Sequence, residues 1–286
     1  MDEKANLGPM KILIATFSFL IFVVAACTSS KEDVAVSKED QELHEMALIY
    51  FKPLPTVSGE ILKLSDRIEL GQKLYFEKKL SINNTISCNS CHALDRFGVD
   101  NEATSPGHDG SRGDRNSPTV YNAALHFAQF WDGRAKDVEE QALGPILNPI
   151  EHGLASESDA LKKIDDPMYR SLFAKAFAGE KDSFNYKNVG RAIGAFERTL
   201  LTEGRFDDYL RGNIKLLSKI EKQGLKTFIE VGCVNCHAGA SIGGDTYRIL
   251  GEVNEYKSSD LGRFKITKKE EDKKMFKVPG LRNITT

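Results

Sequence analysis

The sequence contains Cys88-Asn89-Ser90-Cys91-His92 and, further along, Cys233-Val234-Asn235-Cys236-His237. Both follow the pattern Cys-x-x-Cys-His, which composition alone makes very rare in a chain with 5 cysteines and 6 histidines. Cysteines spaced in this way attach the vinyl groups of a haem as thioethers, and the adjacent histidine ligates the iron. A zinc site would usually need four nitrogen or sulfur ligands where each motif offers three, and a redox dithiol would lie in a βαβ pattern, which is not apparent. We therefore predict two covalently bound c-type haems.

The fifth cysteine, Cys27, closes an apolar segment near the N-terminus. Residues 12–26 are apolar apart from Thr16 and Ser18, which is short for a membrane span and typical of a signal-peptide core. The stretch Val24-Ala25-Ala26-Cys27 resembles the lipobox of bacterial lipoproteins. That resemblance implies a lipoprotein-type signal peptide over residues 1–27 and a lipid anchor on Cys27. An uncleaved N-terminal anchor is the alternative, and both interpretations predict export to the periplasm. Because all five cysteines have other roles, we expect no structural disulfide.

The segment after Cys27 predicts no folded structure. Residues 28–45 are rich in Ser, Lys, Glu and Asp, which predicts a flexible tether between the anchor and the folded part. The net charge of −2, without a basic block, gives no indication of nucleic-acid binding.

The coarse pattern of the remaining chain is helical. Ser65-Asp66 can cap a helix whose apolar side includes Leu74 and Tyr75, and residues 188–201 carry apolar side chains at helical spacing. Ser218-x-x-Glu221 is a capping box that predicts another helix start. Glycine and proline mark loops over residues 105–113, 144–153 and 239–244. We therefore predict a mostly α fold.

A short internal repeat indicates two domains. Gly71-x-x-Leu74-Tyr75-Phe76 precedes the first motif, and Gly224-Leu225-Lys226-Thr227-Phe228 precedes the second. Both resemble the N-terminal helix of a cytochrome c domain, which leads into its haem-binding pentapeptide. The prediction is two tandem cytochrome-c-like domains over residues 46–202 and 203–286, the second of them short.

Haem chemistry depends on the sixth iron ligand and on the pocket above it. Four histidines lie outside the motifs, and one of them, His108, falls in the glycine-flanked loop Ser105-Pro106-Gly107-His108-Asp109-Gly110. A histidine on a mobile loop suits a displaceable sixth ligand, although a loop histidine is more often simply solvated.

Long stretches of the chain resemble the bacterial di-haem cytochrome c peroxidases. The resemblance extends from about residue 62 to the end. The matching stretches are Gly98-Val99-Asp100, Thr104-Ser105-Pro106-Gly107-His108, Arg115-Asn116-Ser117-Pro118-Thr119-Val120, Phe130-Trp131-Asp132-Gly133-Arg134, Glu140-Gln141-Ala142-Leu143-Gly144-Pro145, Ala195-Phe196-Glu197-Arg198-Thr199-Leu200 and Phe276-Lys277-Val278-Pro279-Gly280-Leu281-Arg282-Asn283.

The resemblance implies that the first haem reacts with peroxide. His92 would be its proximal ligand, and His108 its distal ligand in the oxidised state, leaving when the other haem is reduced. Gln141 and Glu151 match the distal glutamine and glutamate of the family, and a carboxylate shielded in a haem pocket can have its pKa raised toward neutrality, which suits a proton shuttle. Without the resemblance, Glu151 would be taken as a solvated loop carboxylate.

Further roles follow from the same resemblance. Trp131, the only tryptophan, would assist electron transfer between the haems, although a packed core aromatic is the alternative. Asn116, with the backbone carbonyls of Lys277 and Pro279, would bind calcium, and all-oxygen ligation fits that hard cation, although Asn116 could equally be a turn residue. The second haem, held by Cys233, Cys236 and His237, would receive electrons from a small cytochrome or copper protein. The family also implies a homodimer.

One departure concerns the second haem. In the family a methionine beyond the Leu-Arg-Asn segment ligates iron opposite the position of His237, and this sequence ends at Thr286, soon after Asn283. We expect the chain to be C-terminally truncated relative to the family, and the alternative is a second haem that lacks its usual sixth ligand.

Two other functions remain open at the level of sequence. An oxygenating relative of the enzyme that matures methylamine dehydrogenase would lack a distal histidine, so His108 argues against it. A non-catalytic di-haem electron carrier would have no need of Gln141 and Glu151. The predicted activity is reduction of hydrogen peroxide to water by a cytochrome c peroxidase.

Overall fold

The computed structural model describes residues 36–57 and 59–285. The predicted signal peptide, Cys27 and residues 28–35 of the predicted tether lie outside the described residues. Residues 36–286 form one compact unit. Among the residues described, no helix is long and apolar enough to cross a membrane.

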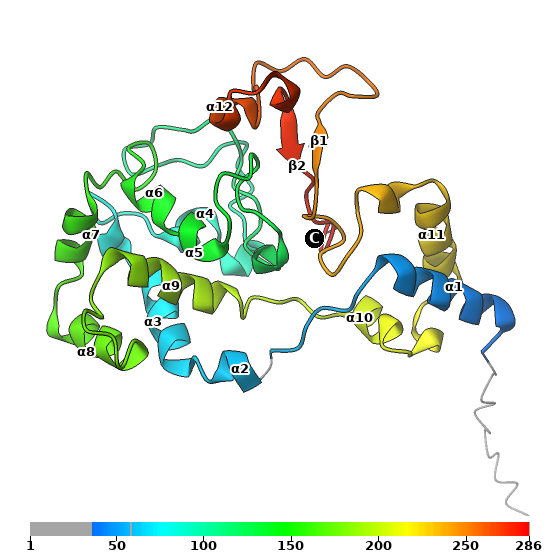
Figure 1. Ribbon diagram of the computed structural model, residues 1–286, viewed down its shortest axis with the longest axis horizontal. Coiled ribbons are helices and arrows are strands. Elements are labelled where there is room, and N and C mark those ends of the chain that lie inside the picture. The colour runs from blue at the N-terminus through cyan, green and yellow to red at the C-terminus, as the bar shows by residue number, and fades with distance from the viewer. Residues whose placement is uncertain (1–35, 58, 286) are drawn as a thin grey trace, which may run out of the picture. The chain divides into compact units, whose positions relative to one another are not determined.

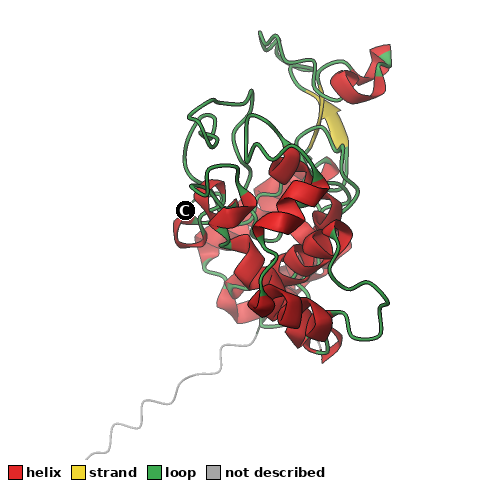
Figure 2. Cartoon of the chain, turned by 90° about the vertical axis from the view of Figure 1, so that its left-hand side faces the viewer, coloured by secondary structure: helices red, strands yellow, loops and turns green. Residues whose placement is uncertain are grey.

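The described chain is mostly helical, which confirms the predicted fold class (Figures 1 and 2). Its α-helices are α1 (Lys38–Tyr50), α2 (Gly59–Leu62), α3 (Ser65–Tyr75), α4 (Cys88–Cys91), α5 (Val138–Gln141), α6 (Leu143–Leu147), α7 (Glu157–Lys163), α8 (Pro167–Ala176), α9 (Tyr186–Glu197), α10 (Arg205–Leu210), α11 (Lys219–Glu230) and α12 (Phe264–Thr267). Short 3₁₀ helices are η1 (Lys78–Leu80), η2 (Leu94–Arg96), η3 (Ala123–Leu125), η4 (Ile214–Leu216), η5 (Cys233–Asn235) and η6 (Glu270–Asp272). Strands β1 (Tyr247–Ile249) and β2 (Met275–Lys277) pair antiparallel, with Arg248 opposite Phe276.

The larger hydrophobic cluster forms around α3 and α9, which pack directly against each other. Gly71 of α3 lies so close to α9 that a Cβ atom there would overlap the carbonyl oxygen of Ala192. The buried face of α9 includes Val189, Ile193 and Phe196, as the helical spacing predicted. Cys88 of the first motif packs against this cluster.

The smaller cluster lies around α1, α10 and α11, which Figure 1 shows side by side. It unites Ala47 and Phe51 with residues from Tyr209 to Val234. The backbone N–H of Gly239, just after the second motif, donates to the carbonyl oxygen of Tyr50, so the end of α1 is joined to that motif. Residues 47–51, which the prediction assigned to the first domain (residues 46–202), therefore pack with the second cluster.

Three local predictions need correction. Residues 38–45 are helical rather than a flexible tether, because Leu43, His44 and Ala47 bury one face of α1. Ser65 is the first residue of α3, so the cap position falls on Leu64 and no side chain caps the helix. The predicted loop 144–153 begins with most of α6.

Two other helix predictions agree with the structure, one of them with shifted ends. The capping box of Ser218 and Glu221 is present at the start of α11. The helix predicted over residues 188–201 runs from Tyr186 to Glu197, because Asn185 caps it earlier, through the backbone N–H of Asn188.

Candidate active site

The first Cys-x-x-Cys-His motif opens onto a cavity of about 430 Å³. The sequence-predicted residues that line it are Cys88, Cys91, His92, Asn116, Trp131, Gln141 and Glu151. They are spread over residues 88 to 151, so the fold gathers most of the residues predicted around the first haem at one cavity.

The motif itself is held so that His92 can ligate a metal. The cysteines lie on α4, whose first turn is fixed by a capping box between Ser87 and Ser90. The Nδ1 atom of His92 donates to the carbonyl oxygen of Pro118 at 2.9 Å, which leaves Nε2 free for iron. Burial lowers the pKa of His92, so the ring is held in the neutral form that a ligand requires. These residues fit a covalently attached haem.

The second motif has a similar local geometry. Its cysteines lie in and directly after η5, which begins after Gly232 in a left-handed conformation with φ 84°. The Nδ1 atom of His237 lies 3.3 Å from the carbonyl oxygen of Ile242, again leaving Nε2 free. The loop beside this ring requires Gly243, because its φ is 131° and a Cβ atom there would overlap the backbone carbonyl oxygen of Pro279 and crowd His237 Nδ1. The second motif therefore also fits a haem.

Gln141 and Glu151 reach the cavity from neighbouring elements. Asp137 caps α5 by accepting from the backbone N–H of Glu140, and Gln141 is the last residue of that helix. Glu151 lies in the loop after α6, where Asn148 Nδ2 donates to its Oε1 at 2.8 Å. Burial raises the pKa of Glu151, and the charge of Arg134 and the hydrogen bond from Asn148 offset part of that rise. The carboxyl group can therefore both hold and release a proton.

His108 lies beside the Glu151 loop, although it is not among the residues that line the cavity. Its backbone N–H donates to the carbonyl oxygen of Glu151 at 2.9 Å, and its Nε2 lies 3.2 Å from the carbonyl oxygen of Pro149. The ring packs over Gly153, where a side chain would collide with it. Its role as a sixth ligand stays a prediction.

Trp131 joins the two segments predicted to bind calcium. Its indole N–H donates to the carbonyl oxygen of Asn116 at 3.1 Å, and its own carbonyl oxygen accepts from the backbone N–H of Lys277 at 2.8 Å. Asn116 therefore contacts the indole of Trp131, and the 277–279 segment contacts the backbone carbonyl of the same residue. Calcium binding there stays a prediction.

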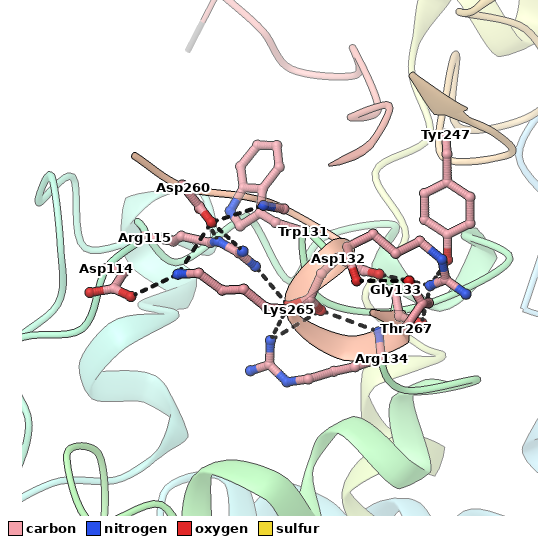
Figure 3. A network of polar contacts seen from close by, with 12 residues as sticks. Asp114, Arg115, Trp131, Asp132, Gly133, Arg134, Tyr247, Asp260, Lys265 and Thr267 are labelled. Atoms are coloured by element: carbon pink, nitrogen blue, oxygen red, sulfur yellow. Dashed lines mark hydrogen bonds and ion pairs between the residues drawn. The ribbon is translucent and has the colours of Figure 1, made fainter. Parts of the chain in front are cut away.

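A network of charged side chains holds the Trp131 loop to the segment before α12 (Figure 3). Arg115 donates twice to Asp260, at 2.6 and 2.9 Å, and once to Asp132, at 2.8 Å. Asp132 is only 3% exposed and also accepts from Arg134 Nη1. Arg115, Asp132 and Arg134 line the cavity, so this network forms part of its wall.

Glu197 is an acidic residue of the cavity for which no role was predicted. Glu197, the last residue of α9, is 5% exposed and lines the cavity near Cys88. Burial, together with repulsion by Glu139, raises the pKa of Glu197 to about 8. The charge of Arg198 offsets only part of this rise, because its guanidinium binds Glu139 at 2.7 and 2.8 Å. The sequence signals were a glutamate on an otherwise apolar helix face and its place in the stretch of residues 195–200 that resembles the family.

Comparison with known proteins gives a consistent result. Residues 65–215 match the family model for di-haem cytochrome c peroxidase. The chain is 41% identical to cytochrome c551 peroxidase of Pseudomonas aeruginosa over 252 residues, covering 85% of this chain and 72% of the relative. It is 42% identical to cytochrome c551 peroxidase of Nitrosomonas europaea over 238 residues, covering 82% and 70%.

A solved structure of a MauG-like protein associated with microbial copper homeostasis has a TM-score of 0.69, with 27% identity over 82% of this chain and 73% of that one. The two Cys-x-x-Cys-His motifs, the cavity at the first of them and these relatives all indicate a di-haem peroxidase. The chain belongs to the di-haem cytochrome c peroxidase family and is an oxidoreductase of the peroxidase class.

Proposed function

We propose that the chain reduces hydrogen peroxide to water in the cavity of the first motif, with electrons that enter at the second motif. The observation that carries this proposal is the convergence of Gln141, Glu151 and His92 on one cavity. An electron carrier has no need of a proton-transferring carboxyl group beside its iron ligand.

The reaction consumes two electrons and two protons for each peroxide molecule and yields two water molecules. A haem held by Cys88, Cys91 and His92 would supply the redox chemistry. Glu151 would take a proton from one peroxide oxygen and deliver it to the other, which its raised pKa suits. The Gln141 amide would hydrogen-bond the peroxide and orient it.

The loop of His108 would control access. In the oxidised state His108 would ligate the iron of a haem held at the first motif, and a His108 that no longer ligates iron would need another partner. The carbonyl oxygen of Pro149 is such a partner. Because His108 is joined to Glu151 through the backbone, movement of this loop would also move the catalytic carboxyl group.

Electrons would come from a small periplasmic cytochrome or copper protein and pass from the second motif to the first with the help of Trp131. Calcium bound by Asn116 and the carbonyl oxygens of Lys277 and Pro279 would stabilise the same region. We further propose that the protein works as a homodimer in the periplasm, anchored through a lipid on Cys27.

Turnover of hydrogen peroxide with a reduced small cytochrome c tests the proposal. Glu151→Gln removes the proton-transferring group and should lower kcat by about 100-fold, while haem content stays unchanged. Glu157→Gln is the matched control, because Glu157 is an exposed carboxylate in the first turn of α7, and it should keep the parent rate. Equal rates in the parent and both variants would refute the role of Glu151.

A further inference from the structure

The second motif has a cationic partner at its outer cysteine. Arg248 Nε donates to the sulfur of Cys236 at 3.3 Å. Arg248 is exposed and lies in the middle of β1, opposite Phe276 of β2. The strand pairing fixes the backbone of Arg248, so its side chain is directed toward the motif by the fold.

The first motif has different neighbours. The outer cysteine there, Cys91, lies near the Ser105 hydroxyl and the carboxylates of Asp100 and Glu151. The inner cysteine, Cys88, lies near the buried carboxyl group of Glu197. The two motifs therefore share a sequence pattern but differ in the charge beside their cysteines.

We propose that Arg248 raises the midpoint potential of the second haem. The sulfur of Cys236 is the atom that bonds to the haem vinyl group, so a guanidinium in contact with it lies at the haem edge. Reduction adds one electron to the iron, and a fixed positive charge nearby stabilises the reduced form. The inference deepens the proposed function, because it rests on a haem at the second motif and concerns how electrons enter there.

The expected size is modest because Arg248 is exposed to solvent and Glu252 lies close enough to offset part of its charge. A unit charge at roughly 10 Å, in a medium of intermediate dielectric constant, changes the ratio of reduced to oxidised haem about fourfold. This shift favours electron entry at the second motif over the first.

Optical redox titration of the holoprotein tests the inference. In Arg248→Ala, the reduced-to-oxidised ratio of the second haem at a fixed potential should fall about fourfold, and it should fall further in Arg248→Glu. Arg248→Lys should restore most of the parent value because it keeps the charge. The first haem should titrate as in the parent in all three variants, and added salt should reduce the differences.

Lys219→Ala is the control, because it removes an exposed cation at the start of α11, about 18 Å of helix before the second motif. A change of the same size in this variant would mean that net charge, rather than contact with Cys236, sets the potential, and would overturn the inference. An unchanged second potential in Arg248→Ala and Arg248→Glu would overturn it as well. The mass of each purified protein gives the number of bound haems independently. Two haems with unchanged potentials would refute only the role of Arg248. A protein without a haem at Cys236 would refute the proposed function too.

Discussion

The two motif regions use the same pentapeptide pattern in different surroundings. The first motif lies above the larger apolar cluster and opens onto a cavity whose wall includes the carboxyl groups of Glu151 and Glu197. The second lies beside a smaller cluster, and its outer cysteine contacts the guanidinium of Arg248. Acidic groups that can hold protons suit a site that converts peroxide to water, while a cation suits a site that accepts electrons. On the proposed function, each motif would attach a haem and its neighbours would determine how that haem is used.

The two regions also differ in what stabilises them. The larger cluster depends on close packing of α3 against α9, whereas the second region includes a buried ion pair. Arg282 binds both carboxylate oxygens of Asp207, at 2.8 and 2.9 Å, and Asp207 is 0% exposed. Asp207 Oδ1 also accepts from the backbone N–H of Leu54, which ties the chain after α1 to α10.

Removing Asp207 should have the largest effect on stability. Asp207→Ala leaves the charge of Arg282 buried and unpaired and should lower the free energy of unfolding by about 3–5 kcal/mol. Asp208→Ala is the control, since that side chain is 62% exposed and lies 3.6 Å from Arg211, and its cost should stay below about 1 kcal/mol. Urea unfolding followed by far-ultraviolet circular dichroism measures both, and equal values for the two variants would contradict the importance of the buried pair.

The same pair predicts a pH dependence. Burial alone would raise the pKa of Asp207, but the hydrogen bonds from Arg282, Leu54 and Gly204 outweigh it and hold the pKa below its ordinary value. The folded state therefore binds fewer protons than the unfolded state, and this stabilisation is lost as the pH falls through the folded pKa. The parent should lose stability in acid more steeply than Asp207→Ala.

The repeated glycines before the two motifs should respond in opposite ways. Gly71→Ala forces apart α3 and α9 and should cost about 1–3 kcal/mol, because the obstructing atom belongs to the backbone. Gly224 has no atom within 4 Å of the position of a Cβ, so Gly224→Ala should stabilise α11 by up to about 1 kcal/mol. Thermal unfolding of the two variants gives the sign directly, and a shared sign would show that the repeat has one structural role.

Glu197 should give an effect that depends on pH. Its pKa is raised from 4.5 to about 8, so the folded state binds more protons than the unfolded state between these values. Stability contributed by this group is present below pH 4.5 and is lost as the pH rises toward 8. Glu197→Gln should match the parent near pH 4.5 and be more stable by at least about 1 kcal/mol at pH 8. Parallel stability curves for the two proteins would mean that Glu197 is not held neutral.

His108→Gly should leave the free energy of unfolding nearly unchanged, because His108 is only half-buried in a loop, where its ring lies against Pro149 and Gly153. The ferric spectrum of the first haem should nevertheless change from low-spin toward high-spin, since the proposed sixth ligand is gone. A variant that stays fully low-spin would show that another group occupies that position.

The sequence was sufficient where local chemistry decides the outcome. The capping box of α11 and the apolar face of α9 depend on neighbouring residues, and both were predicted. Residues 38–45 were not, because a polar composition favours a tether and only contact with α10 and α11 reveals that α1 has a buried face. The resemblance included Arg282 but gave no reason for it, and the reason lies 75 residues away in Asp207.

The candidate site shows the same limit. Glu151 was predicted as a site residue through the family resemblance. The local sequence around it alone favoured a solvated loop carboxylate. Burial of Glu197 in the cavity and contact of Arg248 with Cys236 arise from tertiary packing between distant segments, so no local pattern could have identified them.

Peroxide addition to the half-reduced holoprotein tests most directly whether the two motifs have separate roles. The protein is held at a potential at which one haem is reduced, hydrogen peroxide is added, and the optical spectra of the two haems are followed. We predict that the second haem is the reduced one, that peroxide perturbs only the first, and that the fully oxidised protein does not respond. Peroxide binding at the second haem, or an equal response of both, would contradict the account.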